Sequence, residues 1–423
     1  MQVNKGARGV DSYLLLALFV SLLAALPLLL GPGIVNTRAG GDSPFLLLRV
    51  QQLAANLQGG TLFARWMPDA AFGLGYPAFC FYAAFPYYVA AILSELGLGV
   101  LWGIKLAQTL GFLMAGVMTY LLARELGARR PAALLASAVF TLAPFHLVNV
   151  YVRGDSLSEF WAMALFPTIL WSLRRLARRP GAAEVASVVA SYALLILSHN
   201  ISALVFSPLV GIWLLVQVAG VQREERRRVF LMSGLGLVLG LLLSAWFWLP
   251  ALRETSLVQL GEQTTGYFHF GGHFRWTDLV QWSPIHSYLI DADHDPFAMG
   301  LVQAGIAMLG LGALIVRAVC REHPAPSDWF LALALLGYTW CITPWSRWLW
   351  EHLPLLEYAQ FPWRLLSVQA LLVALVALQI PRRLGGRSAL GLVIVLCLAA
   401  GIGGLAGLRL DRLPVTEADI TTE

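Results

Sequence analysis

Residues 41–49 read GDSPFLLLR and lie in the first long interruption of a very hydrophobic chain, soon after an apolar segment at 11–31. Ser43 is expected to cap a helix here, and Pro44 suits the helix's first position, where no amide hydrogen is needed. The helix is amphipathic, so it is predicted to lie along a membrane surface and not to cross it. Asp42 is therefore predicted to stand at the membrane's outer edge, facing a substrate that is partly lipid. The apolar face of this helix consists of Leu46, Val50, Leu53 and Leu57, and Arg49, Gln51, Gln52 and Asn56 point elsewhere.

The overall composition is that of a polytopic membrane protein. The chain has 423 residues, of which 58% are hydrophobic and 13% are charged, whereas a soluble domain has about 25% charged residues. The net charge of +5 comes from short basic clusters between apolar runs, a pattern typical of membrane topology and not of nucleic-acid binding. The four cysteines are scattered, which predicts neither structural disulfides nor a zinc cluster. The segment at 11–31 is interpreted as a retained first span.

The apolar segments and basic clusters together predict an all-α bundle of about 11 transmembrane helices, with the N-terminus in the cytoplasm. Placing every basic cluster on the cytoplasmic side makes all intervening segments alternate. Four polar regions then lie outside: 32–100, 151–156, 250–298 and 344–363. The predicted spans are 11–31, 101–123, 131–150, 156–173, 183–199, 200–220, 229–249, 299–317, 327–343, 364–380 and 389–409. The basic clusters are Lys5 and Arg8; Arg124, Arg129 and Arg130; Arg174, Arg175, Arg178 and Arg179; Arg223 with Arg226 to Arg228; Arg317 and Arg321; and Arg382, Arg383 and Arg387.

Residues 79–93 are apolar and aromatic, and two interpretations of them stay open. A crossing there would break the alternation of basic clusters. The flanking Pro77 and Pro86 favour a juxtamembrane or membrane-dipping helix instead.

Asp42 has a functional and a structural interpretation. A carboxylate here could act as general base for an acceptor hydroxyl. It could equally be a helix-terminal acid stabilised by the helix dipole. The aromatic stretch that follows, Arg65 to Tyr88, includes Tyr82 and raises a similar choice. Its rings could line a sugar pocket or form an interfacial belt.

A second polar stretch, Arg153 to Glu159, lies between two predicted spans. Asp155 and Glu159 are four residues apart and share a helical face if the helix begins early enough. Alternatively, Ser156 and Glu159 have the spacing of a capping box. The capping box leaves Arg153 and Asp155 unexplained, and charges at this depth are costly unless they are paired or functional.

Three further sets of residues complete the candidates. His199 stands at an outer helix end, and Arg364 follows Gln360 at another. Arg364 could hold a phosphate or could simply snorkel from the interface. In the 250–298 loop, His269 and His273 have a ligand spacing, and residues 291–295 (DADHD) superficially resemble a calcium loop. A divalent metal is therefore an open alternative, and no cofactor is assigned.

Four stretches together resemble one family: residues 41–44, 65–88, 153–159 and 360–364. They look like the bacterial membrane-protein family labelled "6-pyruvoyl-tetrahydropterin synthase-related", of the GT-C glycosyltransferase superfamily. The resemblance implies a single integral-membrane domain over 1–423, with juxtamembrane helices in the first outer loop. This domain divides into a family-like core at 1–220, with outer loop 32–100, and more variable helices at 221–423, with outer loop 250–298. It also implies the bacterial cytoplasmic membrane as location, with an extracytoplasmic active face.

The resemblance also implies roles for particular residues. Asp42 matches the acid that such enzymes carry in the first outer loop, and Asp155 matches a second acidic site. Donors in the superfamily are polyprenyl-phosphate-linked sugars. The sequence has Asp42 alone where some branches have a tandem acidic pair.

Two functions are compatible with these observations. In the first, a membrane glycosyltransferase moves a sugar from a polyprenyl-phosphate carrier to an outer-face acceptor, with Asp42 as base. Arg153, Arg364 or Arg275 would neutralise the leaving phosphate. Asp155 and Glu159 would orient an arginine, a metal or the acceptor. Tyr82 and His199 would bind substrate. In the second, a non-catalytic membrane protein binds or translocates lipid-linked glycans. The predicted spans are almost free of charge, which disfavours a transporter. Neither hypothesis identifies the acceptor, and neither involves nucleic acid.

Overall fold

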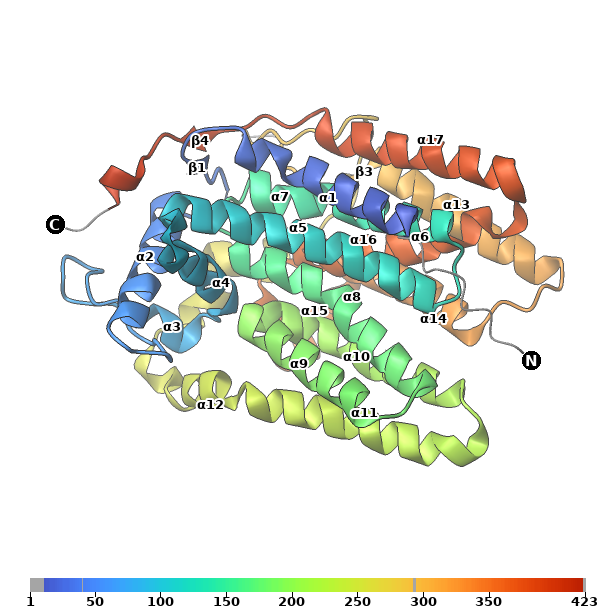
Figure 1. Ribbon diagram of the computed structural model, residues 1–423, viewed down its shortest axis with the longest axis horizontal. Helices are drawn as coiled ribbons and strands as arrows, with labels where there is room; N and C mark the ends of the chain where they lie inside the picture. The colour runs from blue at the N-terminus through green and yellow to red at the C-terminus, as the bar shows by residue number, and fades with distance from the viewer. Residues whose placement is uncertain (1–10, 40, 292–293, 421–423) are drawn as a thin grey trace.

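A computed structural model describes residues 11–39, 41–291 and 294–420 and shows a bundle of long helices (Figure 1). Helices dominate because the chain consists of long apolar runs, whose backbone groups can be satisfied in lipid only within a helix or a closed barrel. The long helices of the bundle are α1 (Ser12–Leu29), α5 (Val100–Glu125), α6 (Arg130–Thr141), α7 (Pro144–Tyr151), α8 (Leu157–Arg178), α9 (Ala182–Ser198), α10 (Asn200–Ala219), α11 (Arg223–Leu243), α12 (Ala245–Arg253), α13 (Leu301–Val319), α14 (Pro326–Cys341), α16 (Leu366–Val376) and α17 (Gly386–Leu405).

Shorter elements gather at one end of the bundle, which we call the site end. Figure 1 shows α2, α3 and α4 at this end, near the strands β1 and β4. Strand β1 pairs antiparallel with β4, which places the end of α1 beside the end of α17. The short elements are α2 (Ser43–Gln58), α3 (Ala78–Phe81), α4 (Phe85–Leu93), α15 (Arg347–His352), β1 (Ile34–Val35), β2 (Val280–Gln281), β3 (Met299–Gly300) and β4 (Arg412–Leu413).

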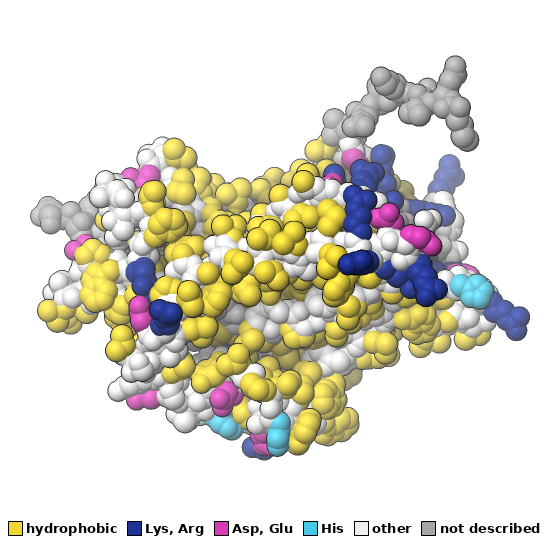
Figure 2. Space-filling model, turned by 90° about the horizontal axis from the view of Figure 1, so that it is seen from below, with side chains coloured by type: hydrophobic (Ala, Val, Ile, Leu, Met, Phe, Trp, Pro, Cys, Tyr) yellow, Lys and Arg dark blue, Asp and Glu magenta, His cyan; other side chains and the backbone are white. Residues whose placement is uncertain are grey.

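The basic connections gather at the opposite end, which we call the basic end. Figure 2 shows Lys and Arg side chains concentrated there, and a mostly hydrophobic surface between the two ends. Ion pairs join neighbouring connections at the basic end, such as Arg178 with Glu125 at 2.7 Å and Arg382 with Asp328 at 2.7 Å. The grouping predicted from the basic clusters is thus confirmed for the described residues, and Lys5 and Arg8 lie outside them. Which end faces the cytoplasm stays a prediction.

Six helical segments are long and apolar enough to cross a membrane in the described part of the chain. The number rises to eight if the bent pairs α6–α7 (43°) and α11–α12 (62°) each form one span. Helices α9 and α14 coincide with predicted spans but have only 17 and 16 residues. The predicted number of about 11 crossings therefore stays a prediction, although a helix covers each predicted span.

The distribution of buried residues is that of a bundle embedded in an apolar solvent. The peripheral helices α1, α11, α13 and α17 expose large apolar side chains, among them Phe19, Phe230, Ile315 and Val395. By contrast, α8 and α16 are almost entirely buried at the centre. Exposed apolar surface on this scale indicates a membrane around the bundle.

Residues 79–93 form α3 and α4, which are too short to cross a bilayer, since about 20 residues are needed. Both are at the site end, where the amides of Val100 and Leu101, at the start of α5, donate to the carboxylate of Glu417. The structure therefore favours the juxtamembrane interpretation of this segment.

Helix α2 confirms the amphipathic prediction but corrects its start. Asp42, and not Ser43, occupies the N-cap position, and the Asp42 side chain makes no capping hydrogen bond. The Ser43 hydroxyl instead accepts from the Thr37 amide and donates to Thr37 Oγ1. Leu46, Val50 and Leu53 are buried as predicted. Gln52 is also buried, contrary to expectation, because its amide nitrogen donates to the carboxylate of Asp69 at 2.6 Å.

Candidate active site

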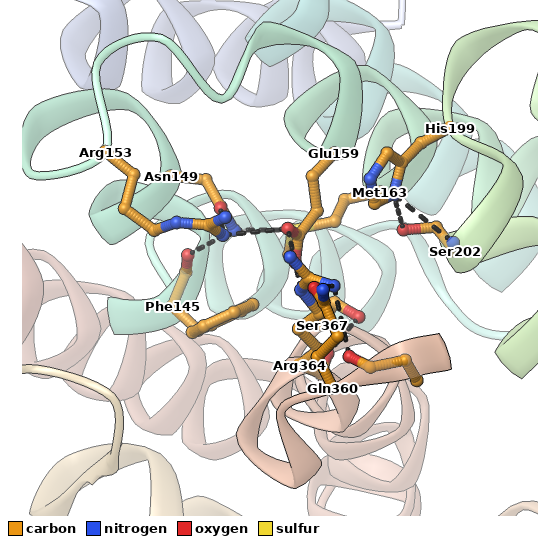
Figure 3. Close-up of polar contacts among 11 residues, drawn as sticks. Phe145, Asn149, Arg153, Glu159, Met163, His199, Ser202, Gln360, Arg364 and Ser367 are labelled. Carbon is orange, nitrogen blue, oxygen red and sulfur yellow. Dashed lines mark hydrogen bonds and ion pairs between the residues drawn. The ribbon is translucent and has the colours of Figure 1, made fainter. Parts of the chain in front are cut away.

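A buried ion-pair cluster lies at the site end of α8. Figure 3 shows Glu159 between two arginines that come from other parts of the chain. Its Oε2 lies 2.7 Å from Arg153 Nη1 and 3.7 Å from Arg364 Nε. Glu159 is only 2% exposed, so the two arginines, and not solvent, are the partners of this carboxylate. We call these three residues the charge triad.

The triad excludes the capping-box interpretation of this stretch. Ser156 occupies the N-cap of α8, but its side chain makes no capping hydrogen bond. Glu159 turns toward Arg153 instead of reaching back to the helix start. The predicted shared face of Asp155 and Glu159 is wrong as well, because α8 begins at Leu157 and leaves Asp155 outside the helix.

Each arginine of the triad is also held by a second set of contacts. Arg153 donates to the Asn149 side chain at 2.8 Å, and its guanidinium lies 5.4 Å from the centre of the Trp363 ring. Arg364 donates to Ala359 O and to Gln360 Oε1. Arg364 is therefore no snorkelling interfacial residue.

Gln360 adopts a left-handed backbone with φ of +63°. Such a conformation costs about 1–3 kcal/mol for a residue other than glycine. The strain turns the chain so that the Gln360 side chain reaches Arg364, while its amide nitrogen donates to Gln263 of the 250–298 loop. The arginine is thus oriented by two separate segments.

His199 lies beside the triad, as Figure 3 shows, but its role in the structure is local. It is the N-cap residue of α10, and its Nδ1 accepts from the Ser202 amide and contacts Ser202 Oγ at 2.8 Å. The predicted substrate contact of His199 stays a prediction.

Asp155 joins the first long loop to the loop before α8. Its Oδ1 accepts from Thr37 Oγ1 at 3.1 Å, and its Oδ2 accepts from the Asp42 amide at 3.3 Å. A Cβ atom at Gly41 would lie 2.0 Å from Asp155 Oδ2, so the approach of the two loops requires glycine there. The structure thus brings Asp42 and Asp155 together, as the sequence predicted, through the Asp42 backbone.

The Asp42 carboxylate itself is unengaged. The residue is exposed, and within the described part of the chain no hydrogen bond or ion pair involves its side chain. Asp155 and Glu159 are both occupied by protein partners. Asp42 is therefore the acid in this group that is free to meet a substrate.

Arg49 is the functional candidate that the sequence analysis missed. Its guanidinium lies over three rings, 4.2 Å from the centre of Phe45, 4.5 Å from Tyr82 and 5.6 Å from Tyr87. It donates to Tyr87 Oη at 3.0 Å, and its Nε is buried without a partner among the described residues. Arg49 forms no ion pair with any described carboxylate. Its place about two helical turns beyond the cap, before a tyrosine-rich stretch, was the available signal.

Five charged groups now converge near Tyr82. Asp155 acts electrostatically on both Arg49 and Arg153, and Tyr82 acts on Arg49, Arg153 and Arg364. Burial is the largest single influence and lowers the pKa of Arg153, but the charge and hydrogen bond of Glu159, together with Asp155 and Tyr82, raise it above its ordinary value. Asp42, whose amide is held by Asp155, adds a third carboxylate, so three guanidinium groups face three carboxylates and the group is balanced in charge.

The other predicted residues are used elsewhere. Arg275 is bound by Asp278 and Asp295, each at 2.6 Å, so it is not a free phosphate ligand. His269 Nδ1 accepts from the Gly271 amide, and His273 Nε2 contacts Tyr267 O. No three His, Cys, Asp or Glu side chains in the described ranges are arranged to hold a metal ion. Asp293, in the predicted calcium-like run, lies outside those ranges.

Comparison with known sequences identifies the family. A family described as "6-pyruvoyl-tetrahydropterin synthase related domain; membrane protein" matches residues 79–405. The chain belongs to this family. No curated protein matches the sequence.

Solved structures identify the fold as that of the GT-C glycosyltransferases. ArnT from Cupriavidus metallidurans, bound to undecaprenyl phosphate, matches 92% of this chain with a TM-score of 0.55 and 16% identity. The Archaeoglobus fulgidus oligosaccharyltransferase matches 95% with a TM-score of 0.58 and 12% identity. The mycobacterial arabinofuranosyltransferase AftD matches 96% with a TM-score of 0.55 and 18% identity. This chain spans 63%, 56% and 29% of these three proteins, respectively.

Proposed function

We propose that this family member is a GT-C-type glycosyltransferase that uses a sugar linked to a polyprenyl phosphate. In this proposal the donor lies at the site end of the bundle, and the acceptor hydroxyl approaches Asp42. The site end would face the outside of a bacterial cytoplasmic membrane.

The unpaired cation Arg49 is the observation that carries this proposal. Arg49 is half-buried, and among the described residues its guanidinium forms no ion pair with a carboxylate and its Nε has no partner, so a bound phosphate would supply a negative charge there. Among the structurally similar proteins, one is bound to undecaprenyl phosphate and another, AglB, is in complex with a dolichol-phosphate. These ligands belong to those proteins, and they agree with the chemistry of the Arg49 site.

The reaction would proceed as one displacement at the anomeric carbon. The acceptor oxygen forms a bond to that carbon while the bond from the carbon to the phosphate oxygen breaks. Asp42 takes the acceptor's proton, as a carboxylate within hydrogen-bond reach can do. The lipid phosphate leaves as an anion, and Arg49 stabilises the charge that develops.

The remaining charged residues position this machinery. Asp155 holds the backbone of Asp42 and so fixes the start of α2. Glu159 pairs with both Arg153 and Arg364 and so keeps the two arginines in place. Their charges then contribute to the electrostatic field at the site without a rearrangement.

The test is transfer from a radiolabelled polyprenyl-phosphate sugar by purified wild-type protein and Asp42→Asn. General bases contribute about 10²–10⁴-fold, so the substitution is expected to lower turnover by at least about 100-fold. Glu357→Gln, at an exposed acid near Gln360, is the matched control and is expected to leave turnover unchanged. Wild-type turnover in well-folded Asp42→Asn would remove the base assignment. Lipid binding without transfer in the wild type would support the non-catalytic alternative.

A further inference from the structure

A second cavity lies in the 250–298 loop, apart from the charge triad. Its volume is about 630 Å³, and its walls include Arg275, Asp278, Gln281, Trp282, Ser287 and Asp295. Ligand pockets in proteins usually enclose about 300–1,000 Å³. The cavity is therefore large enough for two or three sugar rings.

The walls of the cavity are rigidly built. Arg275 bridges Asp278 and Asp295, at 2.6 Å each, and its amide donates to Ile342 O at the end of α14. The Gln281 side chain donates to Ser287 O and accepts from the Ser287 amide. A loop cross-linked in this way is preformed, so a ligand would lose little affinity to ordering it.

The chemistry of the walls favours one ligand class. Trp282 is 81% exposed, which leaves an aromatic face open. Each carboxylate oxygen of Asp278 and Asp295 already accepts one hydrogen bond, from Arg275, the Trp276 amide or the Phe297 amide, and a carboxylate oxygen can accept a second one. Among the described residues that line the cavity, one guanidinium stands against three carboxylates, those of Asp278, Asp291 and Asp295, and this negative balance disfavours a phosphate. An aromatic face beside carboxylate acceptors suits a ligand with an apolar face and many hydroxyl donors.

We propose that this cavity binds a neutral saccharide and that this saccharide is the acceptor, the second part resting on the function proposed above. The cavity is close to the charge triad through a stack of rings. Phe297, two residues beyond Asp295, stacks on Trp363 with ring centres 4.0 Å apart. Trp363 is also the ring that Arg153 covers.

The experiment measures binding of neutral trisaccharides (maltotriose, mannotriose and N,N′,N″-triacetylchitotriose) to the full-length protein by saturation-transfer NMR and calorimetry. At least one trisaccharide is expected to bind the wild type, and Trp282→Ala is expected to weaken that binding at least about tenfold. Trp348→Ala is the matched control, because Trp348 is 67% exposed in α15 but does not line the cavity. It is expected to bind like the wild type.

The possible outcomes separate the two proposals. Absence of binding by all three trisaccharides, or equal binding by Trp282→Ala, overturns the saccharide cavity. Binding that depends on Trp282 in a protein without transfer activity supports the cavity and removes the proposed reaction. Asp42→Asn is expected to keep full saccharide affinity, and a parallel loss there would place the saccharide at Asp42 and overturn the cavity assignment.

Discussion

Replacing Glu159 by Gln removes the one negative charge of the triad without changing its shape. In water-poor surroundings with an effective dielectric constant near 20, two unit charges about 4 Å apart attract by about 4 kcal/mol. Glu159 makes two such contacts, at 2.7 and 3.7 Å, and solvent reaches almost none of it. Breaking a buried ion pair by removing one partner typically destabilises a protein by about 3–5 kcal/mol. We expect Glu159→Gln to lower the free energy of unfolding by this amount.

The assay is equilibrium unfolding in mixed micelles, with Glu351→Gln as the matched control. Glu351 pairs with Arg347 at 3.1 Å on the surface of α15, and both side chains are exposed. Exposed pairs contribute about 0–1 kcal/mol. The control is therefore expected to unfold close to the wild type.

A double-mutant cycle with Arg364→Gln isolates the interaction itself. In the wild type, Arg364→Gln leaves Arg153 to balance Glu159. In the Glu159→Gln background, Arg364→Gln removes an uncompensated cation. There it is expected to lower the free energy of unfolding by at least about 1 kcal/mol less than it does in the wild type. Additive effects of the two substitutions, or a Glu159→Gln protein as stable as the control, would refute the description of the triad as a buried, mutually dependent charge network.

Three further results are expected. Arg49→Gln should weaken undecaprenyl phosphate binding by about 10–100-fold, since a hydrogen bond to a charged group contributes about 1.5–3 kcal/mol; unchanged affinity in a lipid-binding assay would contradict this. Glu417→Gln, which weakens the cap on α5, should lower the unfolding free energy by about 1 kcal/mol and leave lipid affinity intact. Burial lowers the pKa of His286 from 6.5 to about 4, so the unfolded chain binds the proton more tightly than the folded protein does. The free energy of unfolding should therefore decrease as the pH falls from 6.5 to 4, by up to about 3 kcal/mol. His286→Phe should flatten that part of the unfolding-versus-pH curve, and His352→Gln, at an exposed histidine, should not.

The helices and the two ends of the bundle were predictable because their signals are local. Each long helix coincides with an apolar run, and the basic clusters mark one end of these runs. The placement of Asp42 near Asp155 also followed, since both were assigned to the same side. Helix boundaries were less accurate: a shift of one residue moved the N-cap of α2 from Ser43 to Asp42.

The partners within the site could not be predicted, because they depend on contacts between distant parts of the chain. Glu159 meets Arg364 across 205 positions, and no periodicity in either segment encodes that pairing. The capping-box spacing around Ser156 was a real local pattern, but the ion pairs of Glu159 with Arg153 and with the distant Arg364 overrode it. Arg49 was overlooked for a related reason: its importance lies in the rings around it and in its lack of an anion.

In the proposed reaction the two acids of the first and second loops would have different functions despite their proximity. Asp155 spends both oxygens on Thr37 and on the Asp42 amide, so a substrate would have to displace protein contacts to reach it. Asp42 has its backbone fixed by that same carboxylate and its own side chain free. A base must be positioned and unoccupied at the same time, and only Asp42 meets both conditions. The second acid therefore acts through the first, which explains why glycine at 41, where any side chain would strike Asp155, is needed for the loops to meet.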